Sequence, residues 1–73
     1  MVIEEGQLKG AFKGFKDRET VFEFHGGGKW RQNEYNYDYY YAYMPNAKVV
    51  EDRNGVRLHV DGMSDSVEVV RVR

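Results

Sequence analysis

The sequence predicts a single all-β domain over residues 1–73, built as one small antiparallel barrel or as a strongly bent sheet of five to six strands. Aromatic residues make up 15% of the chain, and eight glycines accompany a single proline. Aromatic and β-branched residues favour strands, and glycine favours the turns between them. Short alternating segments, each followed by a turn, are typical of sandwiches and barrels.

The first strand is predicted over Gln7–Phe15, where small or apolar side chains alternate with lysines. We expect Leu8 and Phe12 to face the core, and the lysine-bearing row, which includes Phe15, to face water. Two glycines fall in the inward row, where glycine permits a tight bend or the close approach of another strand. Residues 16–19 are all charged and are expected to form the next turn.

A second strand over Thr20–His25 places Phe22 and Phe24 on one face. The three glycines that follow it are expected to close a hairpin onto a strand that begins at Lys29. The predicted register pairs His25 with Lys29, Phe24 with Trp30, and Phe22 with Gln32. This register puts three aromatic rings, including that of Trp30, on a single core face.

The Asn54-Gly55 pair between two hydrophobic runs predicts a hairpin with a two-residue type I′ turn. The resulting register pairs Arg53 with Val56, Asp52 with Arg57, Glu51 with Leu58, Val50 with His59, and Val49 with Val60. Asp52 and Arg57 would then form a cross-strand pair of opposite charge, while Val49, Leu58 and Val60 would face the core. Residues 61–65 are expected to form a turn, and Val67–Val72 the last strand.

Every odd position from 35 to 43 is a tyrosine, namely Tyr35, Tyr37, Tyr39, Tyr41 and Tyr43. In an extended chain these rings share one side, in a row of roughly 26 Å at about 3.3 Å per residue. Burial of a hydroxyl without a partner costs about 1–3 kcal/mol, so a core that holds all five is disfavoured. We expect the strand to bend, with some rings inside and two or three at the surface as a binding face.

The chain contains no cysteine and only two histidines, His25 and His59. Disulfides, thiolate zinc sites and iron–sulfur clusters are therefore excluded, and two histidines alone cannot complete a zinc site. The Gly26–Lys29 segment lacks the further glycine and the Ser or Thr of a phosphate-binding loop, so we interpret it as a hairpin turn. Neither histidine has a serine and an acid nearby in a triad pattern. We expect no metal, no cofactor and no enzymatic activity.

Eleven basic and twelve acidic residues give a net charge of −1. Nucleic-acid binders usually carry a basic excess on one face. Here the local basic cluster of Lys9, Lys13, Lys16 and Arg18 is diluted by Asp17 and Glu19. A net charge near zero offers little repulsion against association. The first residues lack the features of a signal peptide, and no apolar run has the length of a membrane span. We expect a cytoplasmic protein with no membrane partner.

Several motifs between Gly10 and Pro45 resemble those of a group of short bacterial proteins of unassigned function. The motifs are Gly14-Phe15, Val21-Phe22-Glu23-Phe24, Trp30-Arg31-Gln32 and the alternating tyrosines that end before Pro45. The resemblance implies a small β-barrel of the Src-homology-3-like kind. Asn36-Tyr37-Asp38-Tyr39 is similar to the tyrosine motif of the true peptide-binding family, but the downstream signatures of that family are missing. Recognition of proline-rich peptides is therefore not implied.

These observations predict a non-catalytic binding or assembly module that uses the tyrosine row as its binding surface. The partner expected first is a second copy of the chain, as a homodimer, or another protein. The alternative is a small barrel that binds single-stranded nucleic acid by stacking bases on exposed tyrosines, although the even charge disfavours it. A platform for carbohydrate is a third possibility, and an enzyme is the last.

Overall fold

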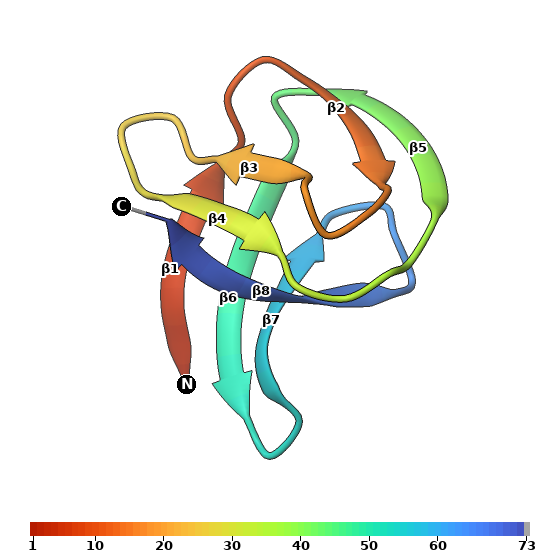
Figure 1. Cartoon of the computed structure of the whole chain (residues 1–73). Helices are drawn as coiled ribbons and strands as arrows, with labels where there is room; N and C mark the ends of the chain where they lie inside the picture. The colour runs from red at the N-terminus through yellow and green to blue at the C-terminus, as the bar shows by residue number, and fades with distance from the viewer. Residues whose placement is uncertain (73) are drawn as a thin grey trace.

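The structure, a computed structural model, describes residues 1–72 and contains eight β-strands and no helix in that range (Figure 1). The strands are β1 (Val2–Gln7), β2 (Ala11–Phe15), β3 (Val21–Glu23), β4 (Lys29–Gln32), β5 (Asp38–Tyr43), β6 (Asn46–Asp52), β7 (Gly55–Val60) and β8 (Ser66–Val72). Six of them form one antiparallel sheet in the order β1-β6-β7-β8-β4-β3, and β2 pairs with β5 in a second sheet. The predicted all-β class is confirmed.

The two outer strands of the larger sheet, β1 and β3, meet and give the sheet a barrel-like form. Leu8, just after β1, forms a β-bridge with Phe24, just after β3. On either side of this bridge, the Lys9 N–H donates to the Glu23 carbonyl at 2.7 Å, and the His25 N–H donates to the Gln7 carbonyl at 2.8 Å. These bonds satisfy backbone groups that an open sheet edge would leave unpaired.

Two long strands bend together, and each bend divides one strand into two shorter ones. β1 continues into β2, and β5 continues into β6. At the bends, two hydrogen bonds of 2.9 Å link the two segments: the Leu8 N–H donates to the Pro45 carbonyl, and the Met44 N–H donates to the Gly10 carbonyl. Gly10 and Met44 have positive φ values of 73° and 48°, which turn the backbone out of the extended region. Six strands remain if each bent pair is counted once, which agrees with the predicted five to six. The predicted strand over Gln7–Phe15 is thus divided, and β1 was not predicted.

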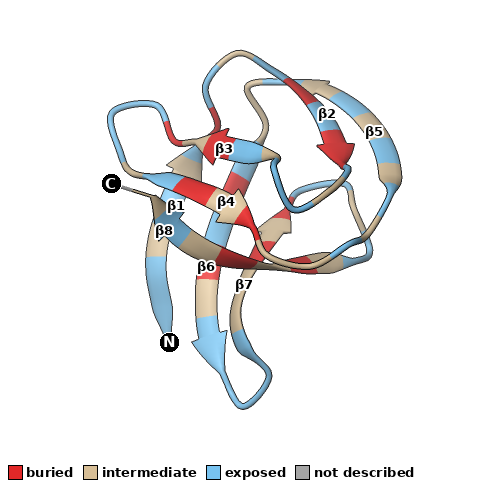
Figure 2. Cartoon of the chain, in the orientation of Figure 1, coloured by how far each residue is buried: buried red, intermediate tan, exposed pale blue. Residues whose placement is uncertain are grey.

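The core lies between the two sheets, and Figure 2 shows buried residues on both β2 and the strands of the larger sheet. On the side of β2 the core is aromatic. The rings of Phe12, Phe15 and Phe22 pack at centroid distances of 6.0–6.2 Å. The predicted outward position of Phe15 is wrong, because its side chain is only 1% exposed. Gly14 has a φ of 94°, and the register of β2 with β5 shifts at this point, so the strict alternation of faces is lost.

The hairpin between β3 and β4 has a different register from the predicted one. Phe22 lies opposite Trp30, two residues away from the expected pairing of Phe24 with Trp30. The Phe24 N–H donates to the Gly28 carbonyl at 3.0 Å, so the three-residue loop spans residues 25–27 in place of the predicted 26–28. Phe24 also forms its bridge with Leu8. A shift of two residues keeps every side chain on its face, and all three aromatic residues are buried as predicted.

The hairpin between β6 and β7 also differs from the prediction. Its turn consists of Arg53 and Asn54 between the paired residues Asp52 and Gly55. Gly55 has a φ of 95°, but Met44 is the only non-glycine residue with positive φ within residues 1–72, so the predicted type I′ turn is wrong. The Asp52 carboxylate accepts a hydrogen bond from the Asn54 N–H at 2.7 Å and stabilises this alternative turn.

The shifted register changes the neighbours on β6 and β7 but not their core face. Arg57 lies opposite Val50, so the predicted Asp52–Arg57 pair is wrong. Val49, Leu58 and Val60 are buried as predicted. The turn over residues 61–65 and the last strand, which is β8, are also confirmed.

Candidate functional site

The five tyrosines at odd positions all lie on the surface. Their exposed fractions are 76% for Tyr35, 64% for Tyr37, 62% for Tyr39, 55% for Tyr41 and 70% for Tyr43. The expectation that some of these rings pack inside is therefore wrong. Figure 2 shows the alternation along β5, where exposed residues alternate with partly buried ones. We call these five side chains the tyrosine face.

The inward positions of β5 explain why the tyrosine face stays outside. Tyr40 packs against the core, and its phenol oxygen lies so close to Gly62 that a Cβ at that glycine would collide with it. Ala42 lies opposite Phe12, so the space beneath this part of β5 is already filled by phenylalanine. Since successive side chains of a strand point to opposite faces, the odd residues of β5 must point outward.

Gln32 holds the segment that carries Tyr35 and Tyr37, which precede β5. Its side chain is fully buried, and its Nε2 donates to the carbonyls of Glu34 at 2.9 Å and Asn36 at 3.2 Å. From the sequence, Gln32 was predicted only to lie opposite Phe22, with no further role. Its inward position two residues after Trp30 was the signal, because a polar side chain in a core row must find internal partners.

Glu34 anchors the same segment to the larger sheet. Its carboxylate forms an ion pair with Arg57, with 3.0 Å between Oε2 and Nη2, and accepts the Glu68 N–H at 3.0 Å. Arg57 is further held by Ser66, whose hydroxyl accepts from the arginine Nε at 2.8 Å. Gln32 thus holds the backbone of the segment before β5 from the core, and Glu34 ties the same segment to β7 and β8.

A groove of about 510 Å³ lies between β2, the Thr20–Phe22 segment and the first exposed tyrosines. The buried rings of Phe12, Phe15 and Phe22 line its floor. The exposed side chains that border it are Ala11, Lys13, Lys16, Val21, Tyr37 and Tyr39. The groove therefore combines an apolar floor with phenol rings and two ammonium groups.

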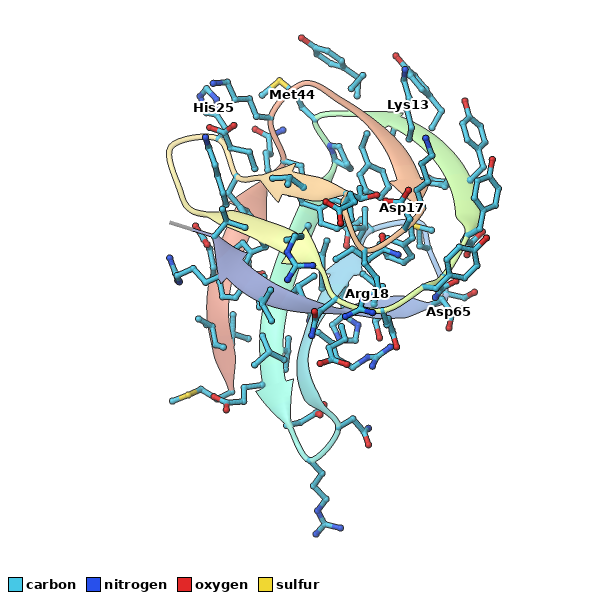
Figure 3. All side chains as sticks on the ribbon, viewed as in Figure 1. Lys13, Asp17, Arg18, His25, Met44 and Asp65 are labelled. Atoms are coloured by element: carbon cyan, nitrogen blue, oxygen red, sulfur yellow. The ribbon has the colours of Figure 1, made fainter. Side chains whose placement is uncertain are left out.

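The two lysines of the groove have no carboxylate partner within the part of the chain that the structure describes. Across residues 1–72 the ion pairs are Lys9–Glu23 and Arg57–Glu34. Asp17 is adjacent to Lys16 in sequence, but its carboxylate forms hydrogen bonds within the turn after β2. Its Oδ1 accepts from the Glu19 N–H at 3.0 Å and from the Thr20 hydroxyl at 3.2 Å. Figure 3 shows Lys13, Asp17 and Arg18 along β2 and the turn that follows it.

The remaining candidate residues have structural positions. His25 is exposed at the loop between β3 and β4, and His59 lies on β7 opposite Lys48 and Ser66. Among the described residues, no three histidine, aspartate or glutamate side chains gather as a set of metal ligands. The predicted hairpin at the three glycines is present, with its turn closed by the bond from the Gly27 N–H to the Phe24 carbonyl at 3.0 Å. No helix in residues 1–72 has the length and apolar character needed to cross a membrane.

Comparison with protein-family models, with curated proteins and with solved structures finds no match to this chain. Function is therefore inferred from the tyrosine face and the groove beside it, because the exposed tyrosines are not part of the hydrophobic core.

Proposed function

We propose that this protein is a non-catalytic binding module that associates with a second copy of itself through the tyrosine face. The observation that carries the proposal is the exposure of all five odd-numbered tyrosines, each at least 55% exposed, while Tyr40 in the same strand packs against the core. Exposed apolar patches of a few hundred Å² mark interaction sites. Tyrosine is enriched in such sites because it offers a large contact area with few rotatable bonds.

The area of the tyrosine face suits a small dimer. An aromatic side chain carries about 150–250 Å², so five rings at these exposures present on the order of 600 Å². A specific interface of ordinary size buries about 800 Å² on each partner. The neighbouring outward residues of β2, Ala11 and Lys13, can supply part of the difference.

The position of β5 also favours contact between copies. Within the described strands β5 pairs with β2 alone, and it curves along the outside of the molecule (Figure 1). An edge strand with unpaired backbone groups is a template for pairing with another chain. A two-fold axis beside β5 would bring the tyrosine faces of two copies together, and the net charge of −1 opposes this only weakly.

Sedimentation velocity over a range of protein concentrations tests the proposal. The wild-type chain is expected to sediment as a dimer at high micromolar concentration, and the double variant Tyr41→Ser with Tyr43→Ser as a monomer. Both tyrosines lie outside the groove, so the variant leaves the groove intact. The matched control is Val2→Ser with Ile3→Ser, which removes two exposed apolar residues from β1. A wild-type monomer at all concentrations, or a dimer equally weakened by the control, would overturn the proposal.

A further inference from the structure

We propose that the groove beside the tyrosine face binds single-stranded nucleic acid, with backbone phosphates at Lys13 and Lys16 and a base stacked on Tyr37 or Tyr39. This inference concerns a different partner from the one in the proposed dimer. The groove shares Lys13, Tyr37 and Tyr39 with the dimer surface, but Lys16 and the phenylalanine floor belong to the groove alone. It rests on three features of the groove, which are its two unpaired ammonium groups, its exposed phenol rings and its size.

The charge of the groove differs from that of the whole chain. The net charge is −1, yet Lys13 and Lys16 border the groove without a carboxylate in ion-pair contact within residues 1–72. Of the two acids that dilute this cluster in the sequence, Asp17 is engaged by hydrogen bonds within its turn. Glu19 and Asp38 do not line the groove, although Asp38 lies opposite Phe15 at the start of β5, and acids such as Glu51 and Asp52 lie at the β6–β7 hairpin, far from β2 (Figure 1). A phosphate at the groove therefore meets two unpaired ammonium groups.

The phenol rings provide the second requirement of a single-strand site. Tyr37 and Tyr39 both border the groove and are 64% and 62% exposed. Bases stack on exposed aromatic rings in a way that tolerates any sequence, because every base has a π face. The bases of a duplex are already stacked on each other, so this mode of contact selects single strands.

The size and shape of the groove limit what can occupy it. Its volume of about 510 Å³ lies within the usual range of about 300–1,000 Å³ for sites that take small organic groups. It has room for a nucleoside unit and not for a double helix. The buried rings of Phe12, Phe15 and Phe22 give it a firm apolar floor, since they pack against one another.

The number of basic groups predicts the salt dependence of binding. Neutralisation of one phosphate in a single strand contributes about −0.7 to the slope of log K against log salt concentration, so two lysines predict about −1.4. We would measure the fluorescence anisotropy of labelled hexathymidylate between about 50 and about 200 mM KCl, the range in which phosphate contacts weaken strongly. Lys13→Gln and Lys16→Gln should each bring the slope to about −0.7. Lys48→Gln, on β6 outside the groove, is the matched control and should leave the slope unchanged.

The stacking contribution is tested by Tyr39→Leu, which keeps an apolar side chain but removes the π face. Affinity for hexathymidylate should fall about tenfold, which corresponds to about 1.4 kcal/mol. The same change at Tyr43, outside the groove, should have little effect. Circular dichroism would show whether each variant keeps the fold of the wild type.

Several outcomes would overturn this inference and leave the proposed dimer intact. One is the absence of any anisotropy change at the lowest salt concentration, and another is an equal loss of affinity for hexathymidylate in Lys48→Gln and Lys16→Gln. The others are an unchanged affinity in Tyr39→Leu and binding of a DNA duplex as tight as that of the single strand. A shift in sedimentation caused by Lys13→Gln, with no binding of oligonucleotide, would assign the groove to a protein contact instead. Conversely, a monomeric protein that binds hexathymidylate with the expected slope would support the groove and remove the dimer.

Discussion

The buried amide of Gln32 holds the backbone of Lys16, with 3.0 Å between the Gln32 Oε1 and the Lys16 nitrogen. The nitrogen of the same amide binds the carbonyl of Asn36, the residue before Tyr37. Gln32 therefore joins the two sides of the groove, because Lys16 borders one side and Tyr37 the other. The positions of a charged and an aromatic group depend on one uncharged side chain beneath them.

Replacement of Gln32 by leucine should destabilise the protein strongly. The variant would leave the Lys16 N–H and the carbonyls of Glu34 and Asn36 without their partner, and each buried unsatisfied group costs about 1–3 kcal/mol. We expect a loss of at least about 2 kcal/mol in the free energy of unfolding, measured with urea. Glu19→Gln, at an exposed turn position, serves as the control. A Gln32→Leu variant as stable as the control would show that these bonds do not hold the groove.

Gly14 and Gly10 offer a matched test of backbone strain and steric overlap. Both have positive φ, so alanine at either position should cost about 1–2 kcal/mol from conformation alone. A Cβ at Gly10 would meet no atom within 4 Å, whereas at Gly14 it would overlap the backbone of β5 at Asp38 and lie 2.6 Å from the Tyr40 nitrogen. Gly14→Ala should therefore lower the melting temperature much more than Gly10→Ala. Equal effects would contradict the close approach of β2 and β5.

The turn between β6 and β7 can be distinguished from a type I′ turn by two substitutions. A type I′ turn centred on Asn54 and Gly55 needs positive φ at both residues. In the structure Gly55 has positive φ and Asn54 does not. Asn54→Ala should change the free energy of unfolding by less than about 0.5 kcal/mol, as is usual for surface positions. Gly55→Ala should cost about 1–2 kcal/mol. A large effect at Asn54 with a small effect at Gly55 would contradict the turn described above.

The inward and outward sides of β5 should respond differently to the loss of one ring. Tyr40→Ser removes a ring that packs on the core, and we expect a loss of roughly 2 kcal/mol or more in the free energy of unfolding. Tyr41→Ser removes an exposed ring and should change the stability of a dilute monomer by less than about 0.5 kcal/mol. Thermal unfolding at low protein concentration separates the two. A more severe loss from Tyr41→Ser would place that ring in the core.

The fold class and most of the core follow from the pattern of residues along the chain. Phe22, Trp30 and Leu58 alternate with polar residues in short segments, and this period of two identified both the strands and their buried face. The same pattern had no means of choosing the hairpin registers. A slip of two residues leaves every side chain on its face, so the predicted and the observed registers satisfy the hydrophobic pattern equally well.

The hairpin registers and the orientation of the tyrosine row depend on contacts in the folded protein. In the β3–β4 hairpin the observed register allows Phe24 to form its bridge with Leu8, which is distant in sequence, whereas at Asp52 a local side-chain bond to the Asn54 N–H stabilises the observed turn. Along β5 both faces carry aromatic residues, so alternation defines two rows without saying which row is inside. The space beneath β5 is filled by Phe12 and Phe15 from β2 and leaves room for Tyr40 and Ala42 alone, which is a matter of volume and not of pattern.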